Sequence, residues 1–123
     1  MLKINSIKFF IISFSFAFAS NHSVLKPMDI FEMEGVSDPQ ISPDGSKILY
    51  VRSGSDIMKD KRYSNIWIIN FDGSDNRPIT SGKNGNSQPR WSPDGKQIIY
   101  VSSSSGSGQI HKRWMDTGET TSL

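Results

Sequence analysis

The sequence predicts an all-β protein: antiparallel four-stranded blades of a β-propeller, about two blades in an incomplete ring, preceded by a signal peptide and a short helix. The first observation is a near-repeat, because "ISPDGSKILYV" begins at Ile41 and "WSPDGKQIIYV" begins fifty residues later at Trp91. The second is that "KILYV" and "NIWII" are continuously apolar, which is typical of strands buried on both faces. The third is the period, since repeats of roughly 40–50 residues are typical of propeller blades.

Residues 1–19 are predicted to be a signal peptide. The only charges in this segment are Lys3 and Lys8, and apolar residues run almost unbroken from Phe9 to its end. The run is too short to cross a hydrocarbon core of about 30 Å as a helix. Its last three residues, Ala-Phe-Ala, have the small-x-small pattern that signal peptidase accepts. We therefore expect an exported protein, periplasmic or extracellular, that leaves the membrane after cleavage.

Residues 20–36 are predicted to form a linker and a short N-terminal helix. Pro27 suits the first helical position, and the acidic residues that follow it favour the N-terminal half of a helix. Gly35 is expected to end the helix. Ile30 and Met33 lie three residues apart, so they are expected to pack the helix on the propeller.

Blade 1 is predicted at residues 37–86. A brief strand ends at Ser42, and the Pro-Asp-Gly sequence then turns the chain, because proline fixes φ and glycine supplies a positive φ. The polar stretch Gly54–Ser64 is expected to be a linking loop. The remaining strands are predicted at Lys47–Ser53, Asn65–Phe71 and around Arg77–Thr80.

Blade 2, predicted as incomplete, occupies residues 87–123. Its strands are expected at Lys96–Ser102 and Gln109–Met115, and its polar link is six residues shorter than in blade 1, as loops allow. Lys112 and Arg113 stand where blade 1 has an Ile-Ile pair. Two interpretations of these cations stay open: a strand near an exposed edge, or a pair facing a water-filled central channel.

The sequence has no recognisable catalytic motif. It contains no Gly-x-Ser-x-Gly, no phosphate-binding glycine loop and no His-Glu-x-x-His. His22 lies at the expected processing site, and His111 has no acidic or histidine neighbour at ligand spacing, so a metal-ligand role is not expected. Asp44 and Asp94 recur at equivalent positions, which favours a role in the turns over a catalytic carboxylate pair. We assign no catalytic, cofactor-binding or metal-binding residue and expect no cofactor.

The composition limits the classes of partner. Cysteine is absent, so disulfides and a lipidated-cysteine anchor are excluded. Lys3 and Lys8 account for the whole formal charge of +2, and a neutral remainder gives no reason to expect a nucleic-acid partner. The charged run Lys59–Arg62 contains an acid and is interpreted as part of a solvated loop.

The tryptophans are the best candidates for a role beyond packing. Trp91 stands where the first repeat has Ile41, so it is expected to lie in the core between the blades; Trp67 and Trp114 are the other two. Asn21-His22-Ser23 matches the N-glycosylation pattern, but its place at the predicted processing site gives it little weight.

The two repeats resemble a known family. "VSDPQISPDGSKILYVRS" from Val36 and "SQPRWSPDGKQIIYVSS" from Ser87 are similar to propeller blades of secreted bacterial serine peptidases of the prolyl oligopeptidase family, often named dipeptidyl aminopeptidases or acylaminoacyl peptidases. The resemblance covers nearly all of Pro27–Leu123. TolB-like periplasmic propellers also carry the Ser-Pro-Asp-Gly repeat, but the helix and the "VSDP" entry favour the peptidases. Lys26 stands where relatives tend to have a Thr or Ser helix cap, which predicts a weaker helix start.

The resemblance implies an N-terminal propeller that gates peptide access to a C-terminal α/β-hydrolase domain with a Ser-Asp-His triad. No triad position is matched, so this chain is expected to be inactive alone. Two blades leave open faces, so the chain is expected to be a truncated part of such a peptidase, prone to self-association through its open blade edges. One alternative is a non-enzymatic TolB-like propeller that acts as a protein-binding scaffold. Another is a complete small module that closes a ring by self-association.

Overall fold

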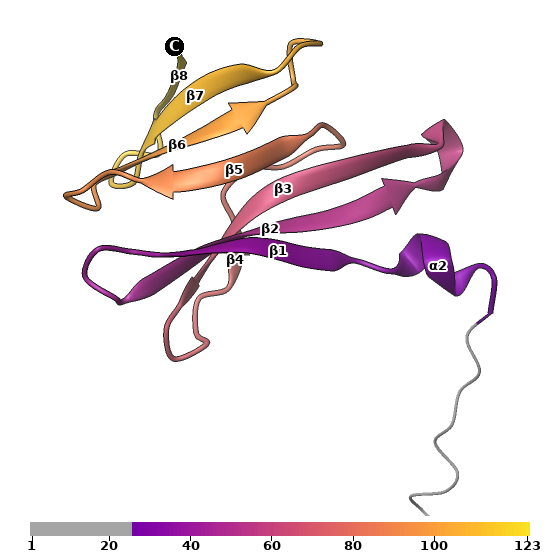
Figure 1. The fold of residues 1–123 in the computed structure, drawn as a ribbon, viewed down its shortest axis with the longest axis horizontal. Coiled ribbons are helices and arrows are strands. Elements are labelled where there is room, and N and C mark those ends of the chain that lie inside the picture. Colours follow the sequence, from indigo (N-terminus) through magenta and orange to yellow (C-terminus); the bar gives the residue numbers. More distant parts are fainter. Residues whose placement is uncertain (1–25) are drawn as a thin grey trace, which may run out of the picture.

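The computed structural model describes residues 26–123, which form two four-stranded antiparallel sheets that pack against each other (Figure 1). In each sheet the strands follow one another in chain order. The predicted all-β architecture of propeller blades is confirmed, and the two sheets form no closed ring within residues 26–123. The predicted signal peptide and the glycosylation pattern lie outside the described residues. The strands of blade 1 are β1 (Gly35–Ile41), β2 (Lys47–Asp56), β3 (Lys61–Asn70) and β4 (Arg77–Pro78); those of blade 2 are β5 (Asn86–Trp91), β6 (Gln97–Ser102), β7 (Gln109–Trp114) and β8 (Thr120–Ser122).

A single helical turn, α2 (Asp29–Glu32), precedes the first sheet. Its N-cap residue Met28 makes no side-chain capping bond, and the Asp29 carboxylate instead accepts a hydrogen bond from the Lys26 backbone N–H at 2.6 Å. Gly35 does not end this turn, because the chain is already extended at Met33 and Gly35 opens β1. Met33 is exposed, so the expectation that it packs the helix on the propeller is wrong. No helix within residues 26–123 has the length and apolar character needed to cross a membrane.

Blade 1 contains a long β2–β3 hairpin. The two strands pair over ten residue pairs, from Lys47 with Asn70 to Asp56 with Lys61, and the short 3-10 helix η1 (Ile57–Lys59) closes the hairpin. Most of the stretch Gly54–Ser64, predicted to be a loop, is therefore strand. Its polar side chains suggested a loop, but its backbone N–H and C=O groups can pair with each other across the hairpin, which satisfies them. The hairpin ends beside α2 (Figure 1).

Blade 2 has a shorter central hairpin and the same strand order. Strands β6 and β7 pair over six residue pairs, and β8 completes the sheet, with the Leu123 N–H donating to the Ile110 carbonyl at 2.9 Å. The four strands predicted for a blade are all present in blade 2, because the last residues pair along β7. Lys112 and Arg113 lie on β7, next to the exposed edge strand β8, as the first interpretation expected. Alternation along the strand places the two side chains on opposite faces of the sheet, so they do not face one channel together.

The core lies between the two sheets. Five buried residues form it: Leu49, Ile66 and Ile68 of blade 1 and Ile98 and Tyr100 of blade 2. Three partly buried residues pack against this cluster: Ile79, Trp91 and Met115. Strand registers place Leu49 opposite Ile68 and Val51 opposite Ile66, so these four share one face. We call this the inner face of blade 1, and we call the face with Ile98 and Tyr100 the inner face of blade 2.

The faces turned away from this core are open. The outer face of blade 1 carries Ile41, Ile48, Tyr50, Trp67 and Ile69, and that of blade 2 carries Ile99, Val101, Ile110 and Lys112. None of these residues is buried, whereas Leu49, Ile66, Ile68 and Ile98, their neighbours in the central strands, are. The continuously apolar strands are therefore buried on one face only, because each sheet packs against a single other sheet within residues 26–123.

Candidate functional site

The Ser-Pro-Asp-Gly turn of blade 1 is a closed network of hydrogen bonds. The Ser42 hydroxyl donates to Asp44 Oδ1 at 2.6 Å and accepts from the Lys47 backbone N–H at 3.0 Å. Asp44 Oδ1 also accepts from the Ser46 N–H at 3.0 Å and from the Ser46 hydroxyl at 2.8 Å. Gly45 has a φ of 75°, the left-handed conformation that glycine tolerates. These bonds stabilise the charged form and lower the pKa of the Asp44 carboxyl to about 2, the Ser42 hydroxyl contributing most.

The turn of blade 2 repeats this network with one donor fewer. The Ser92 hydroxyl donates to Asp94 Oδ1 at 2.6 Å, and the Lys96 backbone N–H donates to the same oxygen at 3.0 Å. The Ser92 hydrogen bond, followed by that of Lys96, lowers the pKa of the Asp94 carboxyl. The turn-forming role predicted for both aspartates is confirmed, since each organises its own turn.

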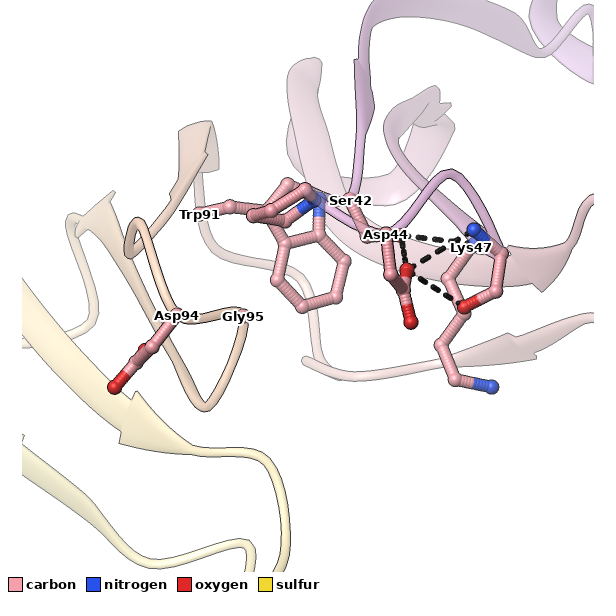
Figure 2. Close-up of a pocket in the computed structure, with 8 residues that line it drawn as sticks. Ser42, Asp44, Lys47, Trp91, Asp94 and Gly95 are labelled. Carbon is pink, nitrogen blue, oxygen red and sulfur yellow. Dashed lines mark hydrogen bonds between the residues drawn. The ribbon is translucent and has the colours of Figure 1, made fainter.

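A groove of about 370 Å³ lies between the two turns (Figure 2). The indole of Trp91 lies between them, and its Nε1–H donates to the Gln40 carbonyl at 3.0 Å. The Asp44 carboxylate lies on the blade 1 side, whereas the Asp94 carboxylate points away from Trp91 (Figure 2). The groove brings the two aspartates to one place, but it does not aim their carboxylates at a common point.

The groove lacks the groups that acyl transfer or metal-assisted hydrolysis needs. Ser42 is buried, and its hydroxyl donates to the Asp44 carboxylate, whose lowered pKa makes it too weak a base to take up the serine proton. The Lys47 ammonium donates to Asn70 Oδ1 at 2.8 Å. Within residues 26–123, no three side chains of His, Cys, Asp or Glu are grouped so as to hold a metal ion. The groove is therefore a recess between two structural turns.

His111 lies on the side of β7 that faces blade 1. Its ring stacks on Tyr100, with 5.6 Å between the ring centroids. Its Nε2 atom is buried and has no hydrogen-bond partner. In this environment the imidazole packs on the Tyr100 ring of the same sheet.

The structure also has a polar clamp between the blades that the sequence analysis did not identify. The Arg90 guanidinium pairs with the Asp38 carboxylate at 2.9 Å, joining the first strands of the two sheets. Asn86 donates from its side chain to the Ser64 carbonyl at 3.3 Å and from its backbone to the Ser64 hydroxyl at 3.1 Å. Asp38 and Gln88, at equivalent repeat positions, both have positive φ at a register shift. A non-glycine residue in that conformation has no clear sequence signal.

The tryptophans have three different environments. Trp91 packs against the core between the sheets, as predicted. Trp67 lies on the outer face of blade 1, stacked with Tyr50, and the Arg52 guanidinium lies 4.6 Å from its ring centroid. Trp114 lies under the Lys112 ammonium at 4.6 Å.

A curated relative shares sequence with part of the chain. The uncharacterized peptidase YuxL of Bacillus subtilis is 40% identical over 55 residues, which are 45% of this chain and 8% of the relative. The match therefore spans less than a tenth of the relative's length.

Solved structures share the fold. An acylaminoacyl peptidase in complex with a chloromethyl ketone superimposes with a TM-score of 0.66 at 23% identity, over 77% of this chain and 14% of that one. The β-propeller domain of the Trilobed protease from Pyrococcus furiosus gives 0.59 at 25% identity, over 73% and 27%. A putative TolB from Agrobacterium tumefaciens gives 0.54 at 28% identity, over 68% and 28%.

A family model gives the broadest coverage. The model of the TolB β-propeller domain matches residues 27–123, which includes both blades and the helical turn before them. This range holds the two Ser-Pro-Asp-Gly turns, the two four-stranded sheets and the clamp between them. The chain belongs to the TolB β-propeller domain family.

Proposed function

We propose that this chain is the N-terminal propeller part of an exported serine peptidase of the prolyl oligopeptidase family, where it restricts access of peptides to a C-terminal α/β-hydrolase domain. The observation that carries the proposal is the 40% identity to a peptidase over 55 residues. The propeller of the Trilobed protease, at 25% identity, supports the same assignment.

The arrangement of the first strands is consistent with a gating role. Strands β1 and β5 lie at the edges of their sheets and are joined by the Asp38–Arg90 pair. Further blades added with the same geometry would place their first strands around a common axis. The passage along that axis would be bordered by these first strands, which suits the gating of a peptide.

The proposal is tested on the native protein. A fluorophosphonate probe labels active serine hydrolases, and mass spectrometry of the labelled proteins would look for peptides from residues 27–123. We expect these peptides in a labelled protein much larger than 13.8 kDa, the mass of this chain. Their recovery solely from unlabelled protein would contradict the proposal. The N-terminus of the same protein reports on export, for which cleavage after Ala19 is expected.

Gating itself needs a comparison of substrates. The probe-labelled enzyme should cleave a short peptide amide rapidly and unfolded casein very slowly. Deleting residues 27–123 should raise the relative rate on casein, because the size restriction is removed. An unchanged ratio of the two rates in a folded deletion variant would assign the restriction to another part of the enzyme.

A second candidate is a non-enzymatic propeller that binds other proteins, as in the alternative drawn from the sequence. The observation that favours it is the 28% identity to a putative TolB over 68% of this chain. The coding sequence beyond Leu123 distinguishes the two. Further blades followed by a Gly-x-Ser-x-Gly motif support the peptidase, whereas blades that end at a stop codon support the binding protein.

A further inference from the structure

The open face of blade 2 carries apolar residues at the positions that blade 1 buries against blade 2. A groove of about 160 Å³ on blade 2 is lined by Gln88, Arg90, Ile99, Tyr100, Val101 and Ile110. The repeat alignment matches these positions with Asp38, Gln40, Leu49, Tyr50, Val51 and Ile66 of blade 1. In blade 1, Leu49 and Ile66 are the residues against which blade 2 packs. The groove on blade 2 is thus the repeat equivalent of the surface on blade 1 against which blade 2 packs.

The matching half of this interface is also uncovered within residues 26–123. Blade 2 covers blade 1 with Trp91, Ile98 and Tyr100. Their equivalents in blade 1 are Ile41, Ile48 and Tyr50, which lie on its outer face. Ile41 is 63% exposed, although it occupies the position at which Trp91 fills the contact between the blades.

The charges near the two open faces differ from those of the existing contact at one main position: Lys112 stands where blade 1 has the buried Ile68, so the contact requires its ammonium to stay at the margin, over the Trp114 ring. In place of the Asp38–Arg90 pair, the equivalent positions carry Gln88 on blade 2 and Gln40 on blade 1, two neutral amides that can hydrogen-bond to each other. Near the outer face of blade 1, the Arg52 guanidinium is paired with the Glu34 carboxylate.

We propose that the outer face of blade 2 binds the outer face of blade 1 of a second copy of this chain, head to tail, repeating the contact between the two blades. Ile41 of the second copy would enter the groove beside Ile99. A head-to-tail contact continues until it closes a ring, and propellers of about four to eight blades correspond to two to four copies. The inference concerns the 123-residue chain by itself and does not rest on the proposed function: in a longer peptidase, a following blade would cover this same face of blade 2.

The test uses the full chain, expressed for export, and its mass in solution by size-exclusion chromatography with light scattering. We expect the wild type to form a discrete oligomer of two to four copies as its concentration rises. Ile41→Asp disables one half of the interface, and Ile99→Asp disables the other. The dissociation constant of each variant oligomer should therefore be at least about tenfold higher than that of the wild type. Both side chains are substantially exposed, so both variants should fold, which circular dichroism verifies.

Mixing the two variants gives the decisive result. The Ile41→Asp chain keeps an intact blade 2 face and the Ile99→Asp chain keeps an intact blade 1 face, so the mixture should form a one-to-one dimer. Ile110→Asp serves as a second variant of the blade 2 face, and Met58→Asp, at the exposed hairpin tip, is the control that should associate like the wild type. A wild type that stays monomeric would overturn the proposal and mean that something other than a second copy covers these faces. Failure of the mixture to dimerise, or either variant associating alone as the wild type does, would also overturn it.

Discussion

Blade 1 and blade 2 share the Ser-Pro-Asp-Gly turn and the strand that follows it but bury opposite faces of that strand. Leu49 is fully buried, whereas its equivalent Ile99 is 43% exposed. Ile66 is fully buried, whereas its equivalent Ile110 is 49% exposed. The difference in burial is reversed at the residue before Ile99: Ile98 is fully buried, and its equivalent Ile48 in blade 1 is not. The comparison shows that a strand's apolar run sets which faces can be buried, and the neighbouring sheet decides which face is.

The largest effect should separate Leu49 from Ile99. Leu49→Ala removes buried methyl groups and leaves a cavity, so it should lower the free energy of unfolding by about 2–5 kcal/mol. Ile99→Ala removes groups that are largely in contact with water, and its cost should be about 0.5 kcal/mol. Urea denaturation measures both, at a protein concentration low enough to keep the chain monomeric. Equal losses at the two positions would mean that blade 2 is covered on both faces.

A second comparison exchanges the residues at one repeat position. Trp91→Ile should lower the free energy of unfolding by about 1–3 kcal/mol, because it removes packing against the core and the hydrogen bond to the Gln40 carbonyl. The reciprocal change, Ile41→Trp, adds an indole to an exposed face and should alter stability by about 0.5 kcal/mol or less. Both are followed by thermal denaturation. The asymmetry would be disproved by comparable effects of the two substitutions.

A third experiment measures the ion pair between the blades. The Asp38 and Arg90 side chains are both partly exposed, so their coupling energy should be about 0.2–1 kcal/mol. A double-mutant cycle with Asp38→Asn and Arg90→Gln isolates this value, and repeating it in high salt should reduce it. A coupling energy of zero at low salt would assign the contact between the blades to packing and to the hydrogen bonds of Asn86 and Trp91.

The smallest effect concerns the two turns and pH. The pKa of Asp44 in the folded chain is about 2, below its ordinary value of 3.8. Because the pKa is lower in the folded chain, ionised Asp44 stabilises the fold fully above pH 3.8. This contribution is lost as the pH falls from 3.8 toward the pKa of the folded chain. Stability should therefore decrease between about pH 4 and pH 2. Asp44→Asn should flatten this decrease more than Asp94→Asn, because Asp44 accepts three hydrogen bonds from its turn and Asp94 accepts two. Identical pH profiles of the two variants would contradict that ranking.

Local patterns predicted the strands and turns well. The Ser-Pro-Asp-Gly turns form where the sequence places them, because their hydrogen bonds connect residues within five positions of one another. The long β2–β3 hairpin was not foreseen, since polar residues 54–64 have a weak strand signal and their pairing depends on the opposite strand. The groove beside Trp91 was missed for a similar reason, because its two sides lie about fifty residues apart in the chain.

The sequence by itself determined the number of repeats, the turn chemistry, and which residues of each strand are apolar. These properties depend on local conformational preferences and on the alternation of side chains along a strand. The tertiary structure alone decided that Leu49 and Ile66 are buried while Ile99 and Ile110 are not, and that Arg90 reaches Asp38. Burial is removal from water by a neighbouring surface, and equivalent residues of a repeat differ in burial whenever their neighbours differ.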